Sequence, residues 1–290
     1  MPRATIGAVA TRRQELFSLK PHPILAVTAV LLTAACSSTT ADAPAAAEKT
    51  AVPAATDYVA LGDSYAAGLG GGGYAPGSCL VSTAGSYPAL WAAGRTGDTV
   101  GEVVNNACSG ARIADVAEKQ LSALDKKTGW VTVTVGGNDA GFTTTLQQCL
   151  LGDEKTCTSS VKKAVTGLAT MPDELGDLFT TIRDRAPNAK VYVLGYPHLV
   201  VGAETRCDAL SATRREVLNA AADTLDEAIE TQTGKHDGFT FVDVRKAFEG
   251  HEACADEPWI NALADNVSES FHPDTKGYQA YADALAKVTG

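Results

Sequence analysis

The apolar residues of this chain are grouped in a way that predicts five short strands. Each group is a brief, mostly apolar run that ends at a glycine or a polar residue, as buried strands do. The clearest run alternates valine and threonine and is followed by two glycines. The runs lie at residues 58–61, 103–104, 131–135, 191–195 and 239–242.

A helical periodicity fills the segments between these strands. Apolar side chains recur every three or four residues in 113–124, 161–185, 213–231 and 278–288. Pro172 divides the second of these segments, because proline interrupts a helix.

The alternation of strands and helices predicts the fold class. Strands too apolar to keep one face in water belong to a parallel sheet that is covered on both faces. With right-handed crossovers, we expect a three-layer α/β/α sandwich with a five-stranded parallel sheet. The length of 290 residues suits one such domain once the N-terminal segment is removed.

The N-terminal segment predicts export. Arg12 and Arg13 precede a continuous apolar run at 24–35, which is too short to span a bilayer but suits the core of a signal peptide. We therefore assign residues 1–35 to a signal peptide. Residues 36–56 are a disordered tether rich in alanine, proline, serine and threonine, and residues 57–290 form the folded domain.

The cysteine at the end of the apolar run leaves two destinations open. The small residues directly before Cys36 resemble a bacterial lipoprotein processing site, in which case Cys36 carries a lipid anchor. Ordinary secretion, with cleavage near Ala35 or among residues 43–47, is the alternative. The protein is then either secreted or a cell-envelope lipoprotein.

The other six cysteines support the same compartment. An even number in an exported protein predicts three disulfides, although six cysteines allow about fifteen pairings. The short polar loop between Cys149 and Cys157 favours that pair. No C-x-x-C motif occurs, and His251 with Cys254 makes only a lone pair of ligands, so we expect no metal and no other cofactor.

Charge narrows the choice of partner. The formal net charge is −10, and residues 1–35 carry four basic residues and one acidic residue, so the remainder carries −13. Such a surface repels phosphate backbones and anionic lipid, which argues against nucleic-acid binding. It leaves a neutral ester or lipid open as substrate, and we expect a monomer.

Four polar segments are expected to meet at one edge of the predicted sheet. Ser64 follows the first strand in Gly-Asp-Ser, Gly110 follows the second, and Asn138 follows the third in Gly-Gly-Asn-Asp. His272 stands in a fourth segment near the end of the chain. Ligands of parallel α/β sheets bind outside the carboxyl ends of the strands, so these residues are candidates for one site.

This set of residues suits acyl transfer. A serine hydroxyl becomes a good nucleophile when an imidazole accepts its proton, and the tetrahedral intermediate needs donors aimed at its oxyanion. Ser64 would attack, and His272 would be the general base. The backbone N–H groups of Ser64 and Gly110 and the amide of Asn138 would form the oxyanion hole. Glu269, three residues before the histidine, could bind its Nδ1 and fix the tautomer.

The four segments, in this order, resemble the sequence blocks of the SGNH (GDSL) hydrolases, which are secreted esterases and lipases. The resemblance runs from about Tyr58 to the C-terminus. Together with the six cysteines, it is closest to the actinobacterial secreted lipases and esterases of that family. It implies a flavodoxin-like fold and the disulfides Cys79–Cys108, Cys149–Cys157 and Cys207–Cys254. The family usually has aspartate where this chain has Glu269, and some members use a backbone carbonyl instead.

Each candidate residue also has an ordinary structural explanation. Ser64 and Asn138 could cap helices, Gly110 could be a turn glycine, and His272 could lie in a surface turn. Four such accidents in the family's order are much less probable than one site. His198, after the fourth strand, is a rival base, but it has no upstream acid at turn spacing.

The run of glycines at 68–73 formally matches a dinucleotide fingerprint. It does not follow its strand directly, and more glycine follows where a helix should begin, so we interpret it as a flexible loop beside the site. The sequence thus predicts an exported serine esterase or lipase that acts through an acyl-enzyme on Ser64. A carbohydrate acetyl esterase of the same fold and a non-catalytic cell-surface binding protein are the alternatives.

Overall fold

The computed structural model describes residues 55–95 and 100–290. The assigned signal peptide, Cys36 and the tether up to residue 54 lie outside the described residues. Within the described part, no helix is long and apolar enough to cross a membrane.

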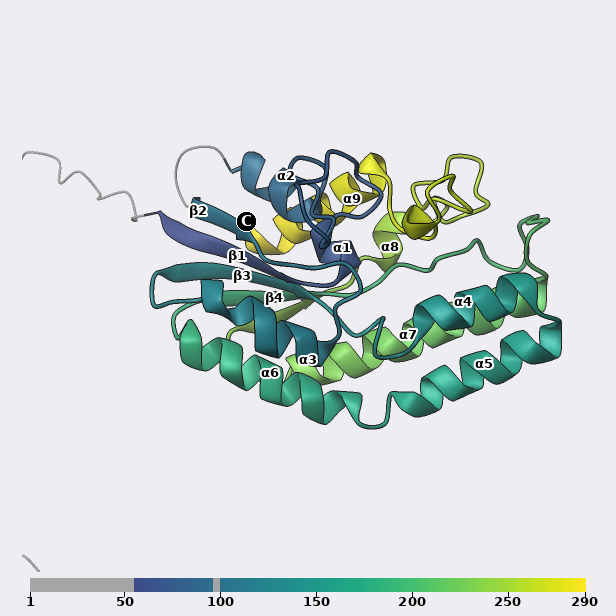
Figure 1. Cartoon of the computed structure of the whole chain (residues 1–290), viewed down its shortest axis with the longest axis horizontal. Helices are drawn as coiled ribbons and strands as arrows, with labels where there is room; N and C mark the ends of the chain where they lie inside the picture. Colours follow the sequence, from purple (N-terminus) through teal and green to yellow (C-terminus); the bar gives the residue numbers. More distant parts are fainter. Residues whose placement is uncertain (1–54, 96–99) are drawn as a thin grey trace, which may run out of the picture. The chain divides into compact units, whose positions relative to one another are not determined.

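Five parallel strands form a single sheet, which confirms the predicted fold class (Figure 1). The order across the sheet is β2-β1-β3-β4-β5, so the chain leaves β1 toward one edge and then crosses to the other side. The strands are β1 (Thr56–Gly62), β2 (Val100–Asn105), β3 (Thr128–Thr134), β4 (Lys190–Leu194) and β5 (Phe239–Val242). This is the flavodoxin-like order, in which ligands bind near the point where the direction of winding reverses, between β1 and β3.

Helices cover both faces of the sheet (Figure 1). One layer holds α2 (Tyr87–Ala93), α8 (Arg245–Phe248) and α9 (Thr275–Thr289). The other holds α3 (Ile113–Asp115), α6 (Met171–Arg185) and α7 (Ala212–Thr233). The inner strands β1, β3 and β4 are almost wholly buried between the layers, whereas edge strand β2 is largely exposed.

Two helices extend past the carboxyl ends of the strands. α4 (Phe142–Leu151) and α5 (Glu154–Gly167) lie on the right of Figure 1, where the chain between α8 and α9 also reaches. That stretch includes the short 3₁₀ helix η3 (Val267–Glu269). α1 (Ser64–Ala67) follows β1 at the same end. These elements surround the edge at which the sequence places its candidate residues.

The helical predictions were partly correct. A break near Pro172 is confirmed, because α6 begins at Met171 with the proline in its first turn. The segment 113–124 is less regular than predicted: α3 passes into a π-helical stretch, η1 (Val116–Gln120), and a 3₁₀ turn, η2 (Leu121–Ala123). The sequence patterns did not indicate α1, α2, α4, α8 or η3.

Three disulfides lie in the loops and helix ends around this edge. They join Cys79 to Cys108, Cys149 to Cys157 and Cys207 to Cys254, the pairs that the resemblance implies. Each typically stabilises a domain by about 2–4 kcal/mol. The pair at 149 and 157 fixes the end of α4 to the start of α5.

Candidate active site

Ser64 is placed by the sharp turn at the end of β1. Gly62 has φ +132°, and a Cβ there would lie 2.1 Å from the carbonyl oxygen of Thr134 on β3, so only glycine fits. Asp63 then caps α1, its carboxylate accepting a bond from the Tyr65 N–H at 2.9 Å. Ser64 is therefore the first residue of a helix at the carboxyl edge of the sheet, with its side chain in a cavity.

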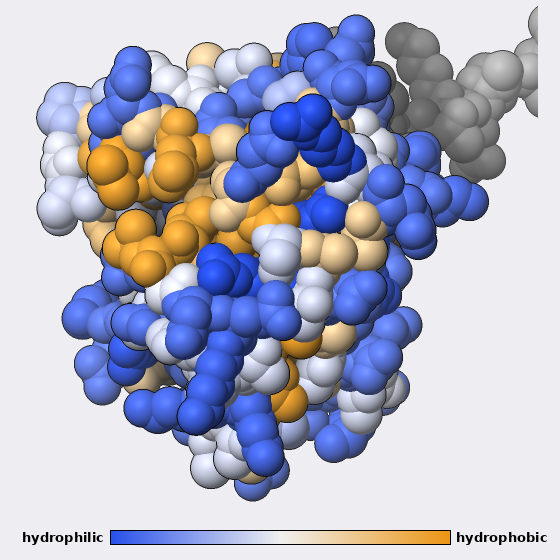
Figure 2. Space-filling view, turned by 90° about the vertical axis from the view of Figure 1, so that its right-hand side faces the viewer, coloured by the Kyte–Doolittle hydropathy of each residue, from blue (hydrophilic) through white to orange (hydrophobic). Residues whose placement is uncertain are grey.

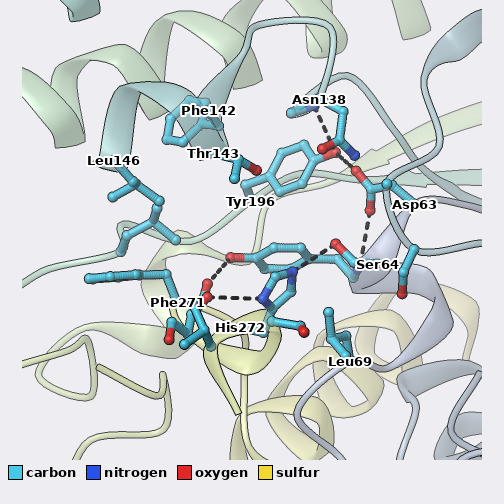
Figure 3. A pocket seen from close by; sticks show the side chains of 18 of the residues that line it. Asp63, Ser64, Leu69, Asn138, Phe142, Thr143, Leu146, Tyr196, Phe271 and His272 are labelled. Atoms are coloured by element: carbon cyan, nitrogen blue, oxygen red, sulfur yellow. Dashed lines mark hydrogen bonds between the residues drawn. The ribbon is translucent and has the colours of Figure 1, made fainter. Parts of the chain in front are cut away.

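The imidazole of His272 meets the hydroxyl of Ser64. The distance from Nε2 to Oγ is 2.7 Å, although the two residues are 208 positions apart (Figure 3). On the other side of the ring, Nδ1 lies 3.1 Å from the carbonyl oxygen of Ser270. A carbonyl can only accept, so Nδ1 carries the proton and Nε2 is free to accept one from the serine.

Burial keeps this imidazole neutral. Desolvation lowers the pKa of His272 to about 4, and the Ser270 carbonyl and the charge of Glu269 oppose that shift. At neutral pH the ring is therefore an unprotonated acceptor facing the serine, which is the state that a general base requires.

The predicted role of Glu269 needs correction. Its Oε1 accepts bonds from the Tyr74 hydroxyl at 2.8 Å and from the Asn266 amide at 3.0 Å, while the Ser270 carbonyl occupies Nδ1 of His272. The reason is a tight turn after η3, in which the His272 N–H bonds the carbonyl of Glu269. That turn directs the Ser270 carbonyl to the ring and leaves the Glu269 side chain on Tyr74.

The two other candidates line the same cavity as Ser64 and His272. Gly110 has φ +83°, and a Cβ there would have no heavy atom within 4 Å, so its backbone borders open space. Asn138 follows β3, and its Nδ2 donates one bond to the Ala111 carbonyl at 3.0 Å. An amide nitrogen has two hydrogens, so this contact orients Asn138 and leaves it a second donor.

Two tyrosines that the sequence reasoning missed hold these parts together. The Tyr196 hydroxyl, just after β4, donates to Asp63 at 2.6 Å and accepts from the Gly137 N–H at 3.1 Å. It therefore links the turn before Ser64 to the turn that carries Asn138. Its position after a strand at this edge is the signal that could have pointed to it.

Tyr65 links the serine turn to the histidine turn. Its hydroxyl donates to the Phe271 carbonyl at 2.7 Å, and its ring centroid lies 5.1 Å from that of His272. Phe271 has φ +59°, a strained conformation for a residue with a side chain, so the turn needs such support. Tyr65 directly follows Ser64 in the sequence, and no pattern rule marks it.

The carboxyl of Asp63 has an unusual environment. It is 1% exposed, and desolvation raises its pKa to about 7 against the opposing bonds from Tyr196 and the Tyr65 N–H. This carboxyl therefore changes its protonation state near neutral pH.

The cavity around these groups has a volume of about 570 Å³ and a largely apolar wall. α4 supplies Phe142, Leu146 and Leu150, and the chain around η3 supplies Leu263 and Val267. Figure 2 shows hydrophobic residues gathered around the hollow at this end of the molecule. The cavity suits a hydrocarbon chain beside a reactive serine.

The remaining candidates lie elsewhere or have structural roles. His198 is paired with Asp223 at 2.9 Å and lines a different pocket. In the glycine-rich loop, a Cβ at Gly70 would lie 2.3 Å from the Pro273 carbonyl, so this glycine permits close packing against the histidine segment. Across residues 55–95 and 100–290, no cluster of three or more His, Cys, Asp or Glu side chains could hold a metal.

Comparisons with known proteins cover the part of the chain that holds these residues. The model of the GDSL-like lipase/acylhydrolase family matches residues 60–280, a range that contains all four segments of the site. Lipase 1 of Streptomyces coelicolor is 43% identical over 238 residues, which is 80% of this chain and 87% of that protein.

Two solved structures are similar over the same region. The extracellular lipase of Streptomyces rimosus has a TM-score of 0.75 at 42% identity and covers 80% of this chain and 99% of its own. Phospholipase A1 of Streptomyces albidoflavus has a TM-score of 0.76 at 37% identity and covers 81% of this chain and 99% of its own.

Proposed function

This chain belongs to the GDSL-like lipase/acylhydrolase family and is a carboxylic ester hydrolase, and we propose that it acts through an acyl-enzyme on Ser64. The observation that carries the proposal is the 2.7 Å contact between Ser64 Oγ and Nε2 of a neutral His272. Membership of the family also sets aside the alternative of a non-catalytic binding protein.

In the first half of the reaction, His272 accepts the proton of Ser64 as the hydroxyl attacks the ester carbonyl. The Ser64 and Gly110 N–H groups and the free amide hydrogen of Asn138 stabilise the oxyanion. His272 then gives its proton to the leaving alcohol, which departs and leaves the acyl group on Ser64.

In the second half, water attacks the acyl-enzyme with His272 again as base. The imidazole is cationic in each transition state, and the Ser270 carbonyl on Nδ1 stabilises that charge and fixes the tautomer. The carbonyl takes the place that the sequence suggested for Glu269.

The substrate is an ester with an apolar acyl chain. The apolar wall of α4 and of the chain around η3 supports this, because an acetylated sugar would leave that surface uncovered. Relatives named lipase and phospholipase A1 support the same class.

The protein is exported before it acts. The apolar segment before Cys36 and a relative described as extracellular support export, and the residues before Cys36 support a lipid anchor. Mass spectrometry of the processed N-terminus would test both points, since an acylated Cys36 adds the mass of its lipid chains.

The function is tested by a substrate panel run on wild type and Ser64→Ala. Wild type should hydrolyse long-chain esters with a higher kcat/KM than acetylated xylan, and Ser64→Ala should lose about 10⁴- to 10⁶-fold in kcat on every ester. Wild-type activity in Ser64→Ala would refute the nucleophile, and a preference for acetylated xylan would refute the substrate class.

A further inference from the structure

Three large hydrophobic side chains on the two segments that line the cavity, α4 and the chain around η3, are unusually exposed. Leu151 is 89% exposed, Val267 75% and Leu263 68%. In the described part of the chain, only Val103 and Val288 are also large, apolar and exposed, at 43% and 46%. We call Leu151, Leu263 and Val267 the apolar rim.

Two residues of the apolar rim belong to the acyl cavity, and the third ends the helix that lines it. Leu263 and Val267 line the cavity themselves, and Leu151 directly follows Leu150, which also lines it. The rim residues come from two elements, the end of α4 and the chain around η3, and hydrophobic surface surrounds the hollow in Figure 2. Such a patch at the entrance of a site usually marks an interaction surface.

The scaffold holds Leu151 outward. The Cys149–Cys157 disulfide fixes the end of α4 just before it. The guanidinium of Arg214 donates to the carbonyls of Cys149 and Gly152, at 2.8 and 2.9 Å, on either side of Leu151. The exposure of this leucine is thus part of a cross-linked and hydrogen-bonded turn.

The opposite side of the rim is held by local hydrogen bonds. The Ala264 N–H donates to the Ser270 hydroxyl at 3.0 Å, and the Ser268 N–H donates to the Asn266 side chain at 3.3 Å. These bonds shape the turns that present Leu263 and Val267.

Exposed carboxylates next to the rim in the sequence indicate which kind of surface covers it. Asp153 and Glu154 follow Leu151, and Asp265 lies between Leu263 and Val267; all three are exposed. The exposed base nearby in sequence is Lys155, and Arg214 is engaged by backbone carbonyls. Carboxylates around an apolar tip attract ammonium groups and repel anionic lipid.

From these observations, and resting on the proposed function, we propose that the apolar rim docks on a zwitterionic phosphatidylcholine surface. Leu151, Leu263 and Val267 enter the acyl region, while the flanking carboxylates meet the outermost choline ammonium groups. The mouth of the cavity then faces the lipid, so that an acyl chain can pass to Ser64 without crossing water.

Insertion is tested with a tryptophan at the rim. Leu151→Trp and the control Val288→Trp are each made in the Ser64→Ala protein. Each protein is purified in the form that the host produces after export and processing. With vesicles of phosphatidylcholine, Leu151→Trp should show blue-shifted emission that brominated acyl chains quench. Val288→Trp should show neither change relative to its parent. Because the tryptophan reports only on its own surroundings, binding of the protein through its N-terminus does not produce this signal.

The kinetic test uses Leu151→Ser, since Leu151 lies outside the cavity wall, with Val288→Ser as control. Leu151→Ser should lower kcat/KM on phosphatidylcholine vesicles by about tenfold, the partitioning lost with one leucine side chain. It should leave kcat/KM on a soluble short-chain ester unchanged, and Val288→Ser should change neither.

Two results of these tests would overturn the docking proposal: no quenching specific to Leu151→Trp, or an equal loss of activity of Leu151→Ser on vesicles and on the soluble ester. Tighter binding of the protein to phosphatidylglycerol vesicles than to phosphatidylcholine vesicles would also overturn it. So would a wild-type dimer that Leu151→Ser dissociates. The last would show that a second copy covers the rim. The quenching experiment does not depend on turnover, so its result stands even if Ser64 is not the nucleophile. Conversely, activity on the soluble ester does not depend on docking, so it stands even if the docking proposal fails.

Discussion

The inner end of the cavity and its mouth are built in opposite ways. Around Ser64 the side chains are buried and hydrogen-bonded: Tyr196 binds Asp63, Tyr65 binds the histidine turn, and His272 is held by a carbonyl. At the mouth, the apolar rim stands in water on turns that are themselves fixed. Proton transfer needs atoms fixed to within a fraction of an ångström, whereas entry of a substrate chain needs a surface that a partner can cover.

After Ser64→Ala, removal of the oxyanion donor should give the largest loss of activity at the inner end of the cavity. Asn138→Ala removes the amide and should lower kcat by about 10²- to 10³-fold, because the donor acts mainly on the charge that develops in the transition state. Steady-state kinetics on a soluble ester would show it, with KM changing little. A loss confined to KM would mean that Asn138 binds substrate instead.

The pH profile of kcat/KM should report the buried state of His272. The base works when neutral, so activity should be full above its pKa and fall as the pH drops through about 4. At pH 5 an enzyme with this base retains about thirtyfold more activity than one whose histidine had the ordinary pKa near 6.5.

The profile is measured with a soluble ester across the acid range. Asp63, whose pKa is raised to about 7, can add a second inflection, and Asp63→Asn separates it from the histidine. An acid limb centred near pH 6.5 in both proteins would contradict the assigned environment of His272.

Tyr65→Phe should give a smaller loss. It removes one hydroxyl bond to the Phe271 carbonyl and keeps the ring against His272. A hydrogen bond of this kind contributes about 0.5–1.5 kcal/mol, so kcat should fall by up to about tenfold with KM unchanged. If Tyr65 only supported the fold, Tm would fall while kcat of the folded protein stayed the same.

Glu269→Gln should have the smallest effect. The carboxylate acts on His272 only through its charge, which raises the pKa of the ring, so its loss should move the acid limb to lower pH and change kcat by less than about threefold. A loss comparable to that of Asn138→Ala would mean that Glu269 contacts the base during turnover.

The fold was predictable from the sequence where burial dictates the pattern. The inner strands are buried on both faces, so their runs of valine, tyrosine and leucine stand out, and the amphipathic α7 is equally clear. α4 was missed because the three consecutive threonines at 143–145 are poor helix formers. The helix is held by a disulfide and by its packing beside the cavity, which no local pattern encodes.

The site was predictable only as a set of residues on one edge. The ends of β1, β2 and β3 place Ser64, Gly110 and Asn138 at the same edge of the sheet. The family pattern supports adding His272 to them. The contact of Glu269 was predicted wrongly, because spacing of three residues does not give the direction of a turn. The positive φ of Phe271 and the bond from Tyr65 set that direction, and both depend on tertiary contacts.

The activation of Ser64 by His272 is tested by labelling with a fluorophosphonate, followed by peptide mass mapping, because the probe reacts with a serine that a neighbouring base activates. We expect a single adduct on Ser64 in wild type and a much slower reaction in His272→Ala. An adduct on another serine, or labelling of Ser64 at the wild-type rate without the imidazole, would contradict it.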